Sequence, residues 1–78
     1  MEEKLVETIV LDNGIEYEII EEQEINNTIY TLFANVNNET DICFRKTIVE
    51  NGEKFYIGLD NENELNLVAM HFIKKYIN

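Results

Sequence analysis

The stretch from Asp41 to Ile77 constrains the fold more than any other part of the sequence. Two runs rich in β-branched and aromatic residues, Ile42–Val49 and Phe55–Leu59, flank an Asn51-Gly52 pair, a strong short-range signal for a β-hairpin. An amphipathic segment with helical spacing follows. This order, strands first and a helix last, predicts a domain of the α+β class.

The register of this hairpin can be tested from the sequence, because a slip of one residue moves every side chain to the opposite face. A two-residue turn at Asn51-Gly52 places Ile48 opposite Phe55. A three-residue loop would instead pair Ile48 with Lys54 and mix polar and apolar side chains on one face. We therefore predict the two-residue turn, with Ile48 and Phe55 in the core.

The first turn, at residues 12–14, is predicted to have a different length from the turn at Asn51-Gly52. A two-residue Asn-Gly turn would place Ile9 and Leu11 opposite glutamates. A three-residue loop with a glycine in the left-handed region pairs Leu11 with Ile15 and Ile9 with Tyr17, which keeps apolar side chains together. We predict the three-residue loop with a bulge.

Three strands are predicted before Asp41, at Leu5–Leu11, Ile15–Ile20 and Ile29–Val36. The last two are joined through an acidic segment and an Asn26-Asn27 pair, which suggests another tight hairpin whose register the sequence does not fix. The polar residues 37–40 are expected to form the most mobile loop.

The C-terminal helix is predicted to begin near Asp60 or Asn61. Asn61 followed by Glu64 is a capping-box pattern, and acidic residues in the first turn with lysines in the last suit the helix dipole. The apolar face is made by Leu65, Val68, Ala69, Phe72, Ile73 and Tyr76 and is widened by Met70 and Ile77, while Leu67 lies outside it. Such a wide face predicts a curled sheet around the helix, or a partner surface.

These elements predict one domain over residues 1–78: a curved antiparallel five-stranded meander sheet with the C-terminal α-helix packed on it. The third strand is apolar on both faces, and one helix cannot cover both, so either homodimerisation or closure towards a barrel is expected. The predicted core consists of Ile9, Leu11, Ile15, Tyr17, Ile19, Leu32, Phe44, Ile48, Phe55, Ile57, Leu59, Leu65, Val68, Phe72 and Tyr76.

The charge of the chain limits its partners. Sixteen acidic residues against six basic ones give a net charge of −10, which favours solubility and repels nucleic acid and anionic membranes. The single cysteine, Cys43, excludes an intrachain disulfide, and no apolar run approaches the ~18 residues of a membrane span. A cytoplasmic protein without direct nucleic-acid or membrane contacts is predicted.

Residues able to carry catalysis are few. The chain has no serine, so nucleophilic catalysis would need Cys43 paired with His71, which the pattern places on a strand and on the polar side of the helix. The oxygens of residues 60–64 lack calcium-loop spacing and suit helix capping better. We predict no catalytic, cofactor-binding or metal-binding residue, and therefore no enzyme.

Several motifs along the chain resemble a known family. They are residues 7–14 (ETIVLDNG), residues 25–30 (INNTIY), residues 50–53 (ENGE) and residues 60–65 (DNENEL). In these features the chain resembles the YrzB-like proteins, small acidic bacterial proteins that form a domain family of unknown function. The resemblance implies a small cytoplasmic protein without an assigned activity, and it brings no catalytic residues.

Two functions follow as hypotheses. The first is a non-enzymatic interaction or regulatory module that binds a protein partner, or a second copy of itself, through an apolar patch or a sheet edge. The second is an acidic inhibitor that mimics nucleic acid and blocks a DNA- or RNA-binding protein. The predicted partner surface consists of Tyr30, Leu32, Leu67, Met70 and Ile77.

Overall fold

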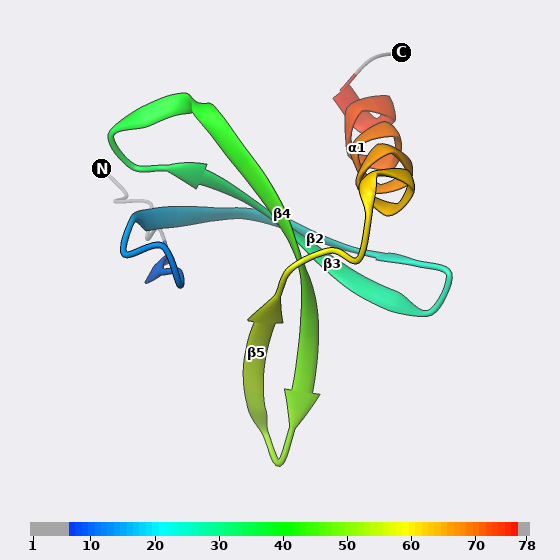
Figure 1. Cartoon of the computed structure of the whole chain (residues 1–78), viewed down its shortest axis with the longest axis horizontal. Coiled ribbons are helices and arrows are strands. Elements are labelled where there is room, and N and C mark those ends of the chain that lie inside the picture. Colours follow the sequence, from blue (N-terminus) through cyan, green and yellow to red (C-terminus); the bar gives the residue numbers. More distant parts are fainter. Residues whose placement is uncertain (1–6, 77–78) are drawn as a thin grey trace, which may run out of the picture.

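The computed structural model describes residues 7–76, and side chains as far as Lys74. Its elements are β1 (Thr8–Val10), β2 (Glu16–Ile25), β3 (Thr28–Asn35), β4 (Asn38–Glu50), β5 (Glu53–Ile57) and α1 (Glu62–Tyr76). The strands lie in the sheet in sequence order, and every neighbouring pair is antiparallel (Figure 1). The α+β meander with one C-terminal helix is confirmed.

The two turns whose register was predicted have the expected geometry. Asn51 and Gly52 have φ angles of 51° and 81°, and Ile48 lies opposite Phe55 across a two-residue turn. Gly14 has φ 79°, and the Leu11 N–H donates to the Ile15 carbonyl at 3.1 Å across a three-residue loop. Positive φ at these positions suits glycine and asparagine, which is why the sequence signal was strong.

The second hairpin is also tight, since Asn26 and Asn27 both have positive φ. Within β2 the pairing with β3 shifts between Ile19 and Glu21. This bulge exchanges the faces of the strand, so that Tyr17 and Ile25 lie on opposite sides of the sheet. The predicted loop at residues 37–40 is wrong in extent, because β4 already begins at Asn38. Its mobility stays a prediction.

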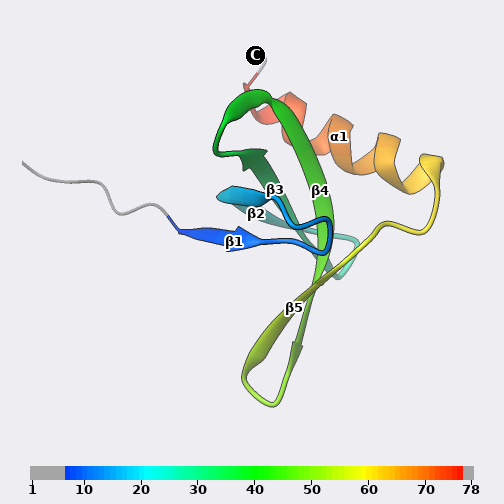
Figure 2. The ribbon, with the colours of Figure 1, turned by 60° about the vertical axis from the view of Figure 1, so that its left-hand side comes forward.

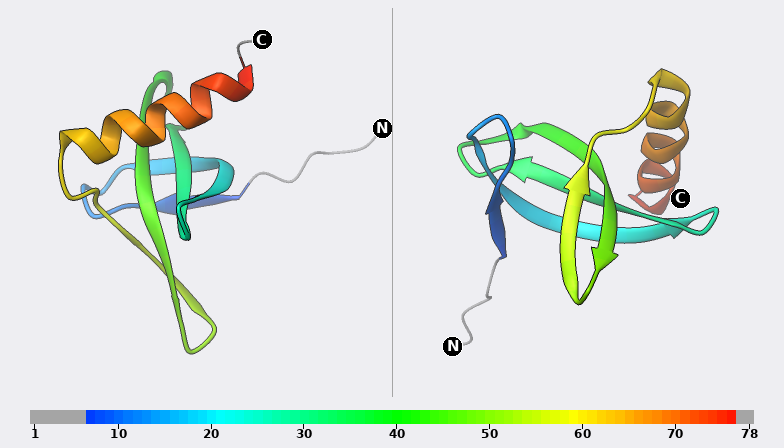
Figure 3. Two further views of the ribbon diagram at one scale, coloured as in Figure 1. Left: turned by 90° about the vertical axis from the view of Figure 1, so that its right-hand side faces the viewer. Right: turned by 60° about the horizontal axis from the view of Figure 1, so that its bottom comes forward.

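The sheet curls into a half-barrel around its inner face, which carries Phe33 of β3 and Tyr17 of β2 (Figures 2 and 3). Phe33 is completely buried there, and its ring meets that of Tyr56 on β5 edge to face, with centroids 5.1 Å apart. The Lys54 Nζ of β5 reaches the Glu22 carboxylate of β2 at 3.1 Å. The curl thus brings β5 into contact with β2 and β3, with which it does not pair.

The helix lies on the opposite, outer face of the sheet (Figures 2 and 3). Its Val68 and Phe72 pack into a cluster with Ile25, Tyr30, Leu32 and Phe44. β3 is therefore covered on one face by α1 and on the other by the curl. Closure towards a barrel accounts for its two apolar faces, so β3 gives no reason to expect a dimer.

The start of the helix is capped as predicted. The Asn61 Oδ1 accepts from the Glu64 N–H at 2.9 Å, and the Glu64 Oε1 accepts from the Asp60 N–H at 2.6 Å. The first contact satisfies a backbone donor that the helix leaves without an internal partner, and the second holds the N–H of the residue before the cap. The capping account of the acidic residues 60–64 is confirmed.

The predicted core was only partly right. Leu11, Tyr17, Leu32, Phe44, Val68 and Phe72 are buried, and Ile9, Ile19 and Leu59 are half-buried against them. The prediction was wrong for five residues, which are exposed by 37 to 45%: Ile15, Ile48, Phe55, Ile57 and Leu65. Three of these lie on the β4–β5 hairpin, which projects away from the helix (Figure 1). The side chain of Tyr76 lies outside the described part of the chain.

Candidate functional site

The most unusual feature of the sheet is a long open edge on β4. This strand has 13 residues, but β5 pairs only with Lys46–Glu50. Of the residues before Lys46, Asn38 and Ile42–Arg45 pair with β3 on one side, and residues 39–41 lie at an irregularity in that pairing. None of residues 38–45 pairs with a described strand on the other side. After Ile57 the chain turns away from β4 to reach the helix, so the row that β5 would occupy further along β4 is left empty.

Backbone geometry shows which groups point to this open edge. In a hairpin with a two-residue turn, the residues next to the turn exchange hydrogen bonds, and bonding then alternates along the strand. Glu50 bonds with β5 in this way, and so do the even-numbered residues before it. The same alternation directs the N–H and C=O groups of Ile42 and Phe44 to the open edge. The Phe44 carbonyl accepts from the Arg45 guanidinium at 3.1 Å.

A groove with a volume of about 510 Å³ runs along this edge. Its apolar wall is formed by Ile42 and Phe44 on the strand and by Leu59 and Leu65 opposite them. Ile42 is 50% exposed and Leu65 is 42% exposed, so both present apolar surface to the groove. The complete lining is Ile42, Cys43, Phe44, Arg45, Leu59, Asn61, Glu62 and Leu65.

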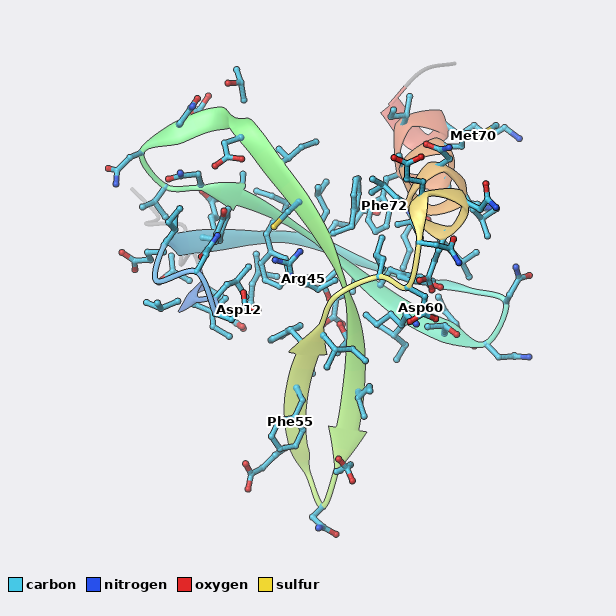
Figure 4. All side chains as sticks on the ribbon, viewed as in Figure 1. Asp12, Arg45, Phe55, Asp60, Met70 and Phe72 are labelled. Carbon is cyan, nitrogen blue, oxygen red and sulfur yellow. The ribbon has the colours of Figure 1, made fainter. Side chains whose placement is uncertain are left out.

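The side of β4 that faces away from the helix is charged. Burial raises the pKa of the Cys43 thiol; Arg45 opposes this rise, and the nearby carboxylates of Asp41 and Asp12 add to it. The Arg45 guanidinium lies 3.9 Å from Asp12, which is 89% exposed (Figure 4 labels both). Two carboxylates against one guanidinium leave an excess of negative charge here.

The other long open edge is protected differently. β2 pairs with β1 only at Glu16–Glu18, so much of its outer edge lacks a strand on that side among the described residues. That edge carries the bulge near Ile20 and the glutamates of residues 21–24. Bulges and charges are the devices that keep strand edges from pairing with other chains. The edge at Ile42–Phe44 has no charged side chain of its own, and the irregularity in β4 lies just before it, between Asn38 and Ile42.

The helix is held beside the groove by a polar contact. Tyr30 Oη donates to Glu64 Oε2 at 2.7 Å, and Lys46 Nζ lies 3.3 Å from the same oxygen. The Asp60 N–H, and to a lesser extent Tyr30 and Lys46, hold the pKa of Glu64 below its usual range. Burial, with help from Glu64, raises the pKa of Tyr30. These contacts join α1 to β3 and β4 at one point.

The predicted partner surface is divided by the structure. Tyr30 and Leu32 are buried beneath the helix and belong to the core. Leu67 and Met70 are exposed by 39% and 63%, and Met70 points away from the sheet (Figure 4). Ile77 lies outside the described residues. A role for Leu67 and Met70 in binding stays a prediction, whereas the groove was not predicted.

The residues considered for catalysis are not assembled into a site. Cys43 lies on the inner face of the sheet, whereas His71 is exposed on the helix, which packs on the outer face. Within residues 7–76, no three histidine, cysteine, aspartate or glutamate side chains are grouped as metal ligands would be. In the same part of the chain, no helix has the length and apolar character that a membrane span requires.

Comparisons of the chain with family models, with curated proteins and with solved structures found no match. The resemblance to the YrzB-like proteins therefore stays a prediction.

Proposed function

We propose that this protein is a protein-interaction module that binds its partner in the groove between β4 and α1. The observation that carries the proposal is the open edge at Ile42–Phe44, where backbone groups that pair with no described strand adjoin an apolar wall. Extended segments commonly add to such edges, because main-chain hydrogen bonds give affinity and the adjoining pocket gives specificity. An interaction of this kind needs no catalytic group.

Selection of peptides tests this function directly. A random-peptide library displayed on phage is panned against the intact protein, and the selected peptides are measured by fluorescence anisotropy. Binding is expected to shift the amide resonances of Ile42 and Phe44 in an NMR titration. Failure to select any binding peptide, or resonance shifts confined to the far side of the helix around Met70, would contradict the proposal.

A matched pair of variants separates the groove from the rest of β4. Ile42 and Val49 are exposed by 50% and 56% on the same strand, and only Ile42 lines the groove. Ile42→Asp is expected to weaken peptide binding about tenfold or more, and Val49→Asp by less than about twofold. Both substitutions introduce the same charge at half-exposed positions, so equal losses would indicate a general electrostatic effect.

Mimicry of nucleic acid has weaker support. A mimic needs its carboxylates gathered on one surface, but the bulge divides the β2 glutamates between the two faces of the sheet. Glu16 also accepts a hydrogen bond from Thr8, and Glu22 pairs with Lys54. The salt dependence of binding tests this alternative, since a mimic should lose nearly all affinity at high ionic strength.

A further inference from the structure

The structure also indicates what kind of partner the groove would take, an inference that rests on the proposed function. We infer that the occupant is an extended segment of another protein that pairs with β4 at Ile42 and Phe44 and alternates apolar with basic side chains. Three features carry this inference: the direction of the backbone groups, the different chemistry of the two sides of the edge, and the net charge.

The backbone groups define the mode of binding. A strand laid along Ile42–Arg45 would occupy the row that β5 leaves after Ile57. The N–H and C=O groups of Ile42 and Phe44 would then exchange hydrogen bonds with it, as Lys46 does with β5 in the hairpin register. An N–H of the partner would donate to the Phe44 carbonyl and replace the Arg45 guanidinium, which donates to that carbonyl at 3.1 Å in the free protein.

The two sides of the edge then define the sequence of the partner. Side chains of a paired strand alternate between the faces of the sheet. On the outer face they would meet Phe44, Ile42 and Leu65, which favours apolar residues. On the inner face they would lie near Asp41 and Asp12, where negative charge exceeds the single guanidinium of Arg45.

The charge of the whole chain supports the same choice. With a net charge of −10, the protein attracts basic segments and repels acidic ones at low ionic strength. Glu62 on the rim of the groove adds to the local negative charge. A second copy of the chain would bring a further ten negative charges to the contact, so a basic partner fits the groove better than self-association.

Three synthetic peptides test the charge pattern. They are eight residues long and alternate valine with lysine, with serine or with glutamate. At low salt the valine–lysine peptide is expected to bind about tenfold more tightly than the valine–glutamate peptide. The difference should narrow at ionic strengths of about 1 M, where charges are screened within about 3 Å. Equal binding of the two peptides overturns the basic partner but leaves the proposed function standing.

A proline variant tests the strand pairing. The Ile42 N–H points to the open edge, so proline there removes the donor to the partner while the bonds to β3 remain. Ile42→Pro is expected to weaken binding of the valine–lysine peptide about tenfold more than Ile42→Ala, which removes the same side chain but keeps the N–H. Equal effects of the two substitutions would overturn strand addition.

N-methylated peptides give the same information without altering the protein, in case the proline variant does not fold. Methylating alternate amides in one phase should abolish binding, because those N–H groups face β4, and methylation in the other phase should be tolerated. Equal tolerance of both phases contradicts strand addition. Sedimentation of the free protein as a dimer that Ile42→Asp dissociates would identify a second copy as the occupant and overturn the basic partner. Loss of all binding, including that of peptides selected from the library, would mean that the proposed function itself has failed.

Discussion

The two halves of β4 differ in what covers them. From Asp41 to Arg45, α1 buries Phe44 on one face and the curled sheet half-buries Cys43 on the other, while Ile42 is exposed and one edge is open. From Lys46 to Glu50 the open edge is filled by β5, but the side chains of Ile48 and Val49 are exposed by 38% and 56%. One half lacks a neighbouring strand, and the other lacks a covering layer. Stability is therefore concentrated in the half that we propose for binding.

The largest expected effect comes from two phenylalanines, one associated with each half. Phe44 is buried against Phe72, with ring centroids 5.3 Å apart, whereas Phe55 opposite Ile48 is 45% exposed. Phe44→Ala should lower the free energy of unfolding by about 3 to 5 kcal/mol, close to the whole stability of a small domain. Phe55→Ala should lower it by less than about 1 kcal/mol.

Urea denaturation followed by circular dichroism measures both variants. Similar losses for the two substitutions would show that the hairpin face is covered in solution, for example by a second copy. The comparison between the halves of β4 would then describe the isolated chain only.

A buried hydroxyl pair gives the second effect. Thr47 is buried, although it lies in the half of β4 that pairs with β5. Its hydroxyl lies 2.5 Å from that of Thr31 on β3. Thr47→Val leaves the Thr31 hydroxyl without this partner and should destabilise the protein by about 1 to 3 kcal/mol. Adding Thr31→Val should restore much of the loss, because both polar groups are then gone. A double variant no more stable than the single one would show that packing, and not the hydrogen bond, determines the loss.

The sequence predicted local geometry better than coverage. The turns at Asn51-Gly52 and at residues 12–14, and the cap at Asn61, depend on local backbone preferences and were predicted with the correct register. Ile48 and Phe55 were correctly paired but wrongly placed in the core. Their burial depends on how far the helix reaches across the sheet, and no local pattern encodes that distance.

The groove was missed for a related reason. A sheet edge was among the predicted binding surfaces, but the predicted strand 42–49 did not indicate that β4 extends back to Asn38. β4 in fact begins at Asn38, in a polar stretch that looks like a loop because neither of its faces is apolar. The bulge near Ile20 determines which side chains of β2 lie on each face of the sheet. It could not be predicted either, because the acidic strand has no clear alternation of apolar and polar residues. The unequal lengths of β4 and β5 are the feature that would have indicated the open edge, and the sequence pattern does not show them.

The stability of the protein is expected to depend on pH through Glu64, which contacts Lys46 where the two halves of β4 meet. Glu64 has a lowered pKa when folded, so its stabilising contribution is complete above the unfolded value of 4.5 and is lost as the pH falls through the folded pKa. Tyr30 has a raised pKa, so stability should also fall as the pH rises above 10. Thermal unfolding of Glu64→Gln between pH 7 and about pH 3 should show a weaker pH dependence than the original protein. Glu62→Gln, in the same helical turn, is the control, and an equal weakening there would contradict the assignment.

The smallest expected effect concerns Arg45, at the end of the open half of β4. Its guanidinium occupies the Phe44 carbonyl that the proposed partner would bind, and it is the base nearest to Asp12 and Cys43. Arg45→Gln should therefore tighten binding of the valine–lysine peptide by about three- to tenfold, since it frees an acceptor and increases the local negative charge.

Lys54→Gln is the matched control for this gain. It changes the net charge by the same amount but lies on β5, paired with Glu22 and away from the groove. Its effect on the same peptide should stay below about twofold, because only distant, screened charge is altered. If the two variants tighten binding equally, net charge alone governs the affinity and the contact between Arg45 and the Phe44 carbonyl does not compete with the partner. A gain confined to Arg45→Gln would place the partner strand on the half of β4 that β5 leaves open.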